Sequence, residues 1–471
     1  MVFSSHIFLF YFLPLSLLVY YCTPRRGKNI ILTVISYLFY GWSNPLFTLL
    51  MFSSTLIDYC CGLVIGLTGD NRSGRRKVAL VCSLVANLSL LGFFKYTGFA
   101  LESYNQFFTL FGDSSFDPVP VLKFLLPLGI SFYTFQSMSY TIDVYRKDGK
   151  CIRNFLDFAC FVSMFPQLVA GPIIRFQEVA DQLLSRVHSF EKFARGVAFF
   201  SFGMAKKVLL ANSCGRIADI TFSAGTVHWI DSWYGIVAYS FQIYFDFSGY
   251  SDMAIGLGLM FGFVFAKNFD SPYCSSSITE FWQRWHISLS TWLREYLYIP
   301  LGGNRKGASR TAVNLAIVML LGGLWHGASW NFVAWGGLHG VLLGSERLLG
   351  KKPFYAALPK VFRVALTFVL VLIAWVFFRA ETFSGALDYL GSMFGLVTVP
   401  NTSLLLDGLL YSPYHLLAMI VAALVVWGAP QTWDWSRQLG IVKAIIVVVV
   451  FILSVAVLSM QSYNPFIYFN F

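Results

Sequence analysis

Long apolar runs recur along the whole chain and are separated only by short polar segments. The first run extends from Ile7 to Tyr21, and the last covers residues 441–460. Since a helix needs roughly 20 mostly apolar residues to cross a bilayer, the pattern predicts an all-α polytopic membrane protein. We expect a single integral membrane domain over residues 1–471, built from roughly eleven to thirteen transmembrane or re-entrant helices.

The composition supports this prediction and excludes a soluble globular protein. Of the 471 residues, 57% are hydrophobic and only 12% are charged, which leaves too little polar side chain to cover a water-exposed surface. The formal net charge of +11 raises the question of nucleic acid as a partner. Because the basic residues form short clusters between apolar runs, orientation in a lipid bilayer explains them better than nucleic-acid binding.

The basic clusters predict which loops face the cytoplasm. They follow the first, third and fifth apolar runs, at residues 25–28, 72–77 and 146–153, whereas the loops between them contain no Lys or Arg. The positive-inside rule therefore places the N-terminus outside the cytoplasm. Further clusters at residues 305–310 and 351–352 bring the final segment, residues 461–471, to the same outer face. We call this segment the C-terminal tail.

A helix is predicted to begin at Ser277, because Ser277 and Glu280 have the spacing of a capping box. It is expected to continue to Pro300. Its apolar and aromatic stripe comprises Phe281, Trp285, Leu289, Trp292 and Tyr296. Such a stripe opposite polar residues is typical of a helix that lies in or dips into the membrane interface. An interfacial packing element without any chemistry explains the pattern equally well.

His326 is the strongest candidate functional residue, because it lies deep in an apolar region behind Gly322 and Gly323. An ionisable group at membrane depth is costly, so it suggests a functional site by default. The alternative is a histidine that neighbouring helices keep neutral. His339, on the following helix, is a packing residue or a partner of the site.

Acidic residues inside the predicted spans form a second group of candidates. Asp246 and Asp252 are the most notable pair, and Asp58 and Asp143 are others. Hydrogen bonds within a helix bundle explain them most simply, and a place in the lining of a site is the alternative. The sequence contains no metal-ligand spacing, nucleotide-binding loop or nucleophile elbow at a convincing position, so no metal is predicted.

Three blocks of sequence are distinctive: Trp285–Ser288, Leu301–Arg305 and Leu324–Gly327. They resemble the membrane-bound O-acyltransferases, and within that family the bacterial branch that serves acetylation of alginate and other exopolysaccharides. Weaker similarity extends over Met1–Ser5, Ser131–Gln136 and Gly171–Pro172. The resemblance implies a bundle of helices around a tunnel, with His326 as the catalytic histidine and His286 as the second family histidine.

The implied chemistry moves an acyl group from a thioester to a hydroxyl, and a histidine with a pKa near neutrality suits the base that takes the hydroxyl proton. Acetyl-CoA is the expected donor substrate, with no bound cofactor. The side chains expected to line the donor passage are Trp282, Arg284, Trp285 and Trp325. A cytoplasmic mouth bordered by Arg294, Arg305, Lys306 and Arg310 would attract the phosphates of the donor.

The C-terminal tail offers a second hypothesis, because it ends in the aromatic segment Asn464–Phe471. Its aromatic rings are explained by anchoring at the membrane interface. The alternative is that Tyr468 accepts the acyl group as an activated phenyl ester. Similar Phe-x-Tyr-Phe endings occur in the polysaccharide branch of the family, so the resemblance favours acetylation of a polysaccharide.

These observations predict an enzyme of the bacterial inner membrane that accepts acetyl groups from cytoplasmic acetyl-CoA. It would pass them to a periplasmic SGNH-hydrolase-like acetyltransferase that modifies alginate or a related exopolysaccharide, with both termini in the periplasm. One alternative is transfer of D-alanine from a carrier protein. Another is a transporter with His326 in its pore, although a transporter would predict internal repeats, which the sequence lacks.

Overall fold

The computed structural model describes residues 2–69, 72–110, 118–122, 124–169, 171–399 and 406–467. The described residues form helices and connecting segments without any strand, which confirms the all-α prediction. They divide into two compact units. Unit 1 comprises Met1–Val187 with Phe263–Phe265 and Gly327–Ser329, and unit 2 comprises the remainder. A single acyltransferase domain over the whole chain stays a prediction.

Unit 1 contains the helices from the N-terminus to α9. They are η1 Phe8–Phe12, α1 Leu13–Cys22, η2 Arg25–Gly27, α2 Lys28–Gly41, α3 Pro45–Leu67, α4 Ser73–Leu91, η4 Gly92–Tyr96, α5 Thr97–Leu110, α6 Ile130–Arg146, α7 Phe155–Ser163, α8 Phe165–Leu168 and α9 Phe176–Leu184. Asp58 of α3 accepts hydrogen bonds from Ser83 at 2.6 Å and from Asn87 at 2.8 and 2.9 Å, both on α4. Asp58 therefore joins two helices, as the simpler interpretation predicted.

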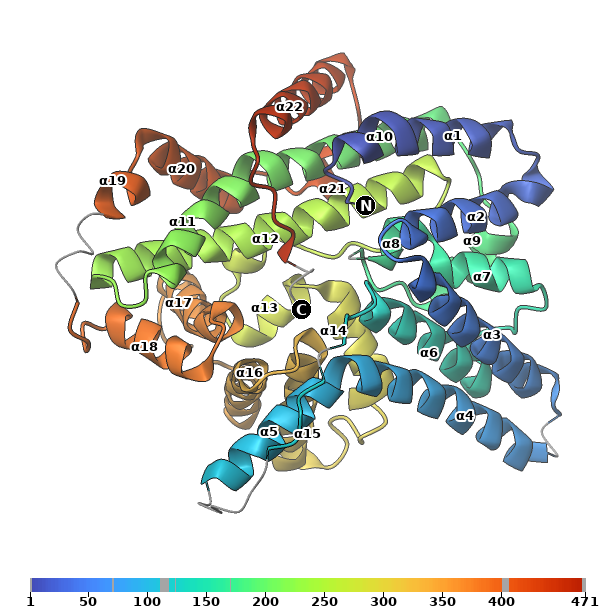
Figure 1. The fold of residues 1–471 in the computed structure, drawn as a ribbon, viewed down its shortest axis with the longest axis horizontal. Coiled ribbons are helices and arrows are strands. Elements are labelled where there is room, and N and C mark those ends of the chain that lie inside the picture. Colours follow the sequence, from blue (N-terminus) through green and yellow to red (C-terminus); the bar gives the residue numbers. More distant parts are fainter. Residues whose placement is uncertain are drawn as a thin grey trace. The chain divides into compact units, whose positions relative to one another are not determined.

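Unit 2 contains the helices from α10 onward. They are α10 Phe190–Ala205, η5 Lys206–Ala211, α11 Asn212–Ser223, α12 Trp229–Met260, η6 Pro272–Cys274, α13 Ile278–Arg284, α14 Ile287–Leu293, η7 Arg294–Tyr298, α15 Gly307–His326, α16 Trp330–Leu348, α17 Lys360–Arg379, α18 Phe383–Met393, α19 Asp407–Leu410, α20 Pro413–Gly428, α21 Thr432–Trp435 and α22 Ile441–Met460. The long helix α12 lies beside α10 and α11 (Figure 1).

Five helical segments among the described residues are long and apolar enough to cross a membrane. They are Pro45–Leu67, Ser73–Leu110, Gly307–His326, Lys360–Arg379 and Ile441–Met460. Two shorter apolar segments, Phe8–Cys22 and Pro413–Gly428, accompany them. The chain is therefore a multi-pass membrane protein. The predicted eleven to thirteen helices include short and re-entrant helices. Such helices do not need the length of a full membrane crossing.

Helices α15 and α16 pack closely because glycines face each other across their contact. A Cβ atom at Gly323 would lie 2.2 Å from the backbone oxygen of Phe332, and one at Gly336 would lie 2.4 Å from that of Met319. Small residues let membrane helices approach to this extent. The close contact fixes His326, the last residue of α15, relative to the side chains of α16.

The predicted continuous helix from Ser277 to Pro300 is wrong. The predicted start is confirmed, since the Ser277 hydroxyl accepts a hydrogen bond from the Glu280 N–H at 3.0 Å. The helix then ends at Arg284, and α14 begins only at Ile287. The backbone of His286 adopts a left-handed conformation with φ 43°, which is incompatible with a right-handed helix.

Glu346 of α16 holds the N-terminus of α13. Its carboxylate accepts hydrogen bonds from the N–H groups of Ile278 at 2.8 Å and Thr279 at 3.0 Å, and from the Thr279 hydroxyl at 2.6 Å. A carboxylate satisfies the unpaired N–H groups at a helix start and interacts favourably with the helix dipole. The buried Glu346 thereby fixes α13, and the turn that follows it, against α16.

Candidate active site

The two histidines singled out from the sequence lie next to each other inside unit 2. The ring centroids of His286 and His326 are 6.4 Å apart. Both side chains are buried, and that of His286 is fully inaccessible. His326 ends α15, whereas His286 occupies the break between α13 and α14. The fold therefore brings together two residues that are 40 positions apart in the sequence.

Aromatic side chains enclose both imidazoles. The ring of His326 lies 5.2 Å from those of Trp335 and Phe378, and 5.0 Å from that of Trp325. The ring of His286 packs edge-on against Phe247 at 4.6 Å. A wall of this kind excludes water and strengthens the electrostatic interactions of any group bound beside the histidines.

The imidazole of His286 has unused hydrogen-bonding capacity. Both of its ring nitrogens are buried, and neither makes a hydrogen bond within the part of the chain that the structure describes. Burial, and to a smaller extent the neighbouring His326, hold the pKa of His286 well below its usual range. Its ring is therefore neutral near pH 7. A buried polar atom without a partner costs about 1–3 kcal/mol, so both nitrogens favour a bound molecule.

Asn268 holds the backbone around His286 in place. Its backbone oxygen accepts a hydrogen bond from the Ile287 N–H at 2.9 Å. Its side-chain oxygen accepts from the N–H of Ser288 at 3.2 Å and from the Ser288 hydroxyl at 2.8 Å. The side-chain amide of Asn268 donates to Ser251 of α12 at 2.9 Å. These contacts stabilise the left-handed turn that points His286 away from the helical path.

Two of the tryptophans predicted for the donor passage pack in the apolar core that contains Trp335. The indole N–H of Trp282 donates to Nδ1 of His339 at 3.2 Å. This contact makes His339 a partner of a predicted site residue. Trp285 packs between Phe269 and Trp375, with ring centroids 5.1 and 5.0 Å away. The structure places both tryptophans in the same apolar core as Trp335 and Phe378.

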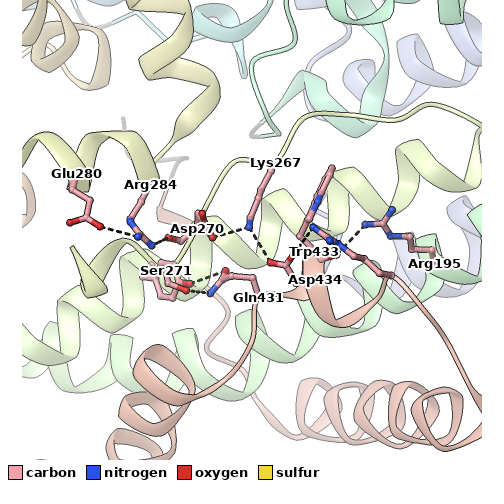
Figure 2. Close-up of polar contacts among 11 residues, drawn as sticks. Arg195, Lys267, Asp270, Ser271, Glu280, Arg284, Gln431, Trp433 and Asp434 are labelled. Atoms are coloured by element: carbon pink, nitrogen blue, oxygen red, sulfur yellow. Dashed lines mark hydrogen bonds and ion pairs between the residues drawn. The ribbon is translucent and has the colours of Figure 1, made fainter. Parts of the chain in front are cut away.

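Arg284 takes part in a chain of polar contacts that ties the segment before α13 to α21. Arg284 pairs with Glu280 at 2.9 Å and donates to the backbone oxygen of Asp270 at 3.1 Å (Figure 2). Lys267 lies between Asp270 and Asp434, at 2.8 and 3.3 Å. Arg284 therefore has an ionic partner, Glu280, in this partly exposed network, and its place in the donor passage stays a prediction.

The basic residues predicted at the donor mouth lie on exposed segments. Arg294 forms an ion pair with the adjacent Glu295 at 2.8 Å and remains largely exposed. Arg305, Lys306 and Arg310 are exposed just before and within the first turn of α15. Exposed basic side chains can meet the phosphates of an incoming donor. A role of these residues at the donor mouth stays a prediction.

Asp246 and Asp252 of α12 each pair with a lysine that the sequence analysis missed. Asp246 contacts Lys207 at 2.8 Å, and Asp252 contacts Lys206 at 2.7 Å. The sequence feature that could have pointed to these lysines is their position next to each other within a predicted span. Trp335 and Phe378 were also missed, because aromatic residues are too frequent in this chain for one to stand out.

The described part of the C-terminal tail enters unit 2 instead of lying along its surface. Phe466 stacks on Tyr250 with ring centroids 4.4 Å apart, and both Phe466 and Ile467 are buried. For these two residues, anchoring at the membrane interface is the wrong explanation. Tyr468 lies outside the described residues, and its predicted acylation stays a prediction.

The sequence matches a family of membrane acyltransferases and is similar to proteins named as O-acetylating enzymes. Residues 150–379, which include both histidines, match the profile of MBOAT, the membrane-bound O-acyltransferase family. The chain is 43% identical to a "Probable alginate O-acetylase" of Pseudomonas putida over the full length of both proteins. It is 45% identical to one of Pseudomonas aeruginosa, over 94% of this chain and 84% of the relative. A "Peptidoglycan O-acetyltransferase" of Helicobacter pylori is 35% identical, over 100% and 98%.

Proposed function

Because the chain belongs to the membrane-bound O-acyltransferase family, we propose that it transfers acetyl groups from acetyl-CoA to serve O-acetylation of alginate or a related exopolysaccharide. The observation that carries the proposal is the contact between the buried imidazoles of His286 and His326 inside the segment that matches the family. The extensive similarity to two proteins named as probable alginate O-acetylases supports acetyl as the group and a polysaccharide as the final acceptor.

In the proposed reaction, His326 is the general base. Its imidazole takes the proton of the attacking hydroxyl while the hydroxyl oxygen forms a bond to the thioester carbonyl carbon. When the carbon–sulfur bond breaks, the departing thiolate of coenzyme A recovers that proton from the imidazolium. His286 would bind the reacting groups through ring nitrogens that make no hydrogen bond among the described residues. The aromatic wall keeps water from competing with the acceptor hydroxyl.

The first acceptor in this proposal is the hydroxyl of Tyr468. Ile467, the residue before it, is buried in the core that contains Trp335 and Phe378, which both contact His326. A phenyl ester retains much of the reactivity of the thioester, so it can pass its acetyl group onward. A periplasmic SGNH-hydrolase-like acetyltransferase would take the group and deliver it to the polymer, with both termini of this chain in the periplasm.

The test is to incubate the purified wild-type protein with isotopically labelled acetyl-CoA and to locate the label by peptide mass spectrometry. We expect release of free coenzyme A and label on the peptide that contains Tyr468. Label on another side chain would contradict the acyl-tyrosine step alone. No turnover of acetyl-CoA would contradict the proposed donor, and D-alanyl carrier protein would be tested next.

The indole N–H of Trp335 is a candidate donor to the thioester carbonyl oxygen. It is buried, makes no hydrogen bond within the described part of the chain, and belongs to a ring 5.2 Å from His326. Trp335→Phe should lower kcat for acetyl transfer by about 10²-fold, because one donor to the developing oxyanion is lost. The matched control is Trp375→Phe, since the Trp375 N–H already donates to the Tyr273 hydroxyl at 3.2 Å. Equal effects of the two substitutions on kcat would assign Trp335 to packing.

A further inference from the structure

Two adjacent lysines lie at a π-helical turn between α10 and α11. This turn, η5, widens the helix at Lys206–Ala211, and such turns are frequent at functional sites. Lys207 forms an ion pair with Asp246 of α12 at 2.8 Å, and both side chains are only 2% exposed. The backbones come this close because Gly203 and Gly249 face each other, so that a Cβ at Gly203 would lie 2.4 Å from the Gly249 oxygen.

The Lys207–Asp246 pair binds the C-terminal tail on both sides of Phe466. Oδ2 of Asp246 accepts a hydrogen bond from the Ile467 N–H at 2.9 Å. Nζ of Lys207 donates to the backbone oxygen of Pro465. Both contacts involve the backbone of the tail, so they specify where the chain runs and not which side chains it carries. The ring of Phe466 between them stacks on Tyr250.

Further contacts hold the tail before it reaches the ion pair. The side-chain amide of Asn212 donates to Gln461 at 3.2 Å and to the backbone oxygen of Tyr463 at 3.3 Å. The hydroxyl of Tyr463 donates to Asp219 of α11. The tail is thus attached at successive points from Gln461 to Ile467, and the deepest of these is the buried ion pair.

A buried ion pair is a poor source of stability, because removing two charges from water costs about as much as their attraction returns. Apolar residues of similar size often replace such a pair without loss of stability. The pair at Asp246 therefore needs another explanation, and its contacts with the tail backbone provide one. The neighbouring pair of Lys206 and Asp252 differs in this respect, since Asp252 contacts Thr432 of α21 and makes no hydrogen bond to the described part of the tail.

We propose that Lys207 and Asp246 are positioning residues that clamp the C-terminal tail at Pro465 and Ile467. The clamp fixes Ile467 in the apolar core that also contains Trp335 and Phe378. The proposal rests on the proposed function, in which the tail carries the first acyl acceptor. It assigns the buried Lys207–Asp246 ion pair to positioning of the segment that carries the acyl acceptor.

The test compares the double variant Lys207→Met/Asp246→Leu with the matched control Lys206→Met/Asp252→Leu. Each removes one lysine–aspartate ion pair and keeps side chains of similar length, and thermal unfolding verifies that both proteins fold. Hydrogen–deuterium exchange of the peptide that contains Ile467 reports on the clamp. We expect exchange at least about 10-fold faster in the first variant and unchanged exchange in the control. Labelling of the tail from acetyl-CoA should fall by about the same factor in the first variant only.

Unchanged exchange in Lys207→Met/Asp246→Leu would overturn the clamp. Faster exchange with unchanged labelling of Tyr468 would overturn the positioning role and leave the proposed function intact. If the wild-type tail takes no label, the acyl-tyrosine step of the proposed function fails, and the exchange experiment still decides whether the ion pair holds the tail. Should the double variant not fold, Asp246→Asn gives the same two measurements with the carboxylate charge removed.

Discussion

His326→Gln is expected to lower kcat for acetyl transfer by about 10²–10⁴-fold, the usual contribution of a general base. Glutamine fills a similar volume among Trp335 and Phe378 but cannot take a proton from the acceptor hydroxyl. The measurement is the rate of coenzyme A release from acetyl-CoA by purified protein, with thermal unfolding recorded in parallel. Binding of the donor should change little, because His326 acts on the acceptor.

The control for this substitution is His228→Gln, since His228 is an exposed histidine at the start of α12. Its variant should retain the wild-type rate. If His326→Gln also retains that rate and only unfolds at a lower temperature, then His326 is the neutral packing histidine that the sequence left as an alternative. The result therefore separates catalysis from packing at the one residue on which the proposed mechanism depends most.

The sequence predicted those features that depend on local pattern. Runs of apolar residues predicted the membrane helices, because the bilayer sets a length that can be read directly from the chain. The capping spacing correctly placed the start of α13 at Ser277. His326 stood out because an ionisable group in an apolar run needs an explanation wherever its neighbours lie.

The break at His286 could not be predicted, because helical spacing of apolar residues continues across it. The break depends on Asn268, which accepts hydrogen bonds from Ile287 and Ser288 although it lies 19 and 20 residues earlier in the chain. Such a contact arises only from the tertiary fold. These hydrogen bonds outweigh the local preference for a continuous helix. As a result, the side chain of His286 lies beside His326.

The course of the C-terminal tail was missed for a related reason. The charge pattern indicates the side of the membrane on which the tail begins, but it carries no information on whether the chain then turns into the bundle. That turn depends on Lys207 and Asp246, which lie 258 and 221 residues before their partners in the tail. Asp246 stood out only as an acidic residue in a predicted span and Lys207 was missed, and only the fold brings both to the same backbone segment.

Tyr468→Phe is expected to abolish labelling of the tail from acetyl-CoA and acetylation of the polymer in cells. The substitution removes one hydroxyl oxygen, which is the proposed nucleophile, and keeps the aromatic ring. Tyr463→Phe is the matched control, because it removes the other tyrosine hydroxyl of the tail, which donates to Asp219, and retains Tyr468 itself. Label should persist in that control. If Tyr468→Phe acetylates the polymer at the wild-type rate, the acetyl group passes directly from the donor to an external acceptor, and the buried tail serves only to close the core around His286 and His326.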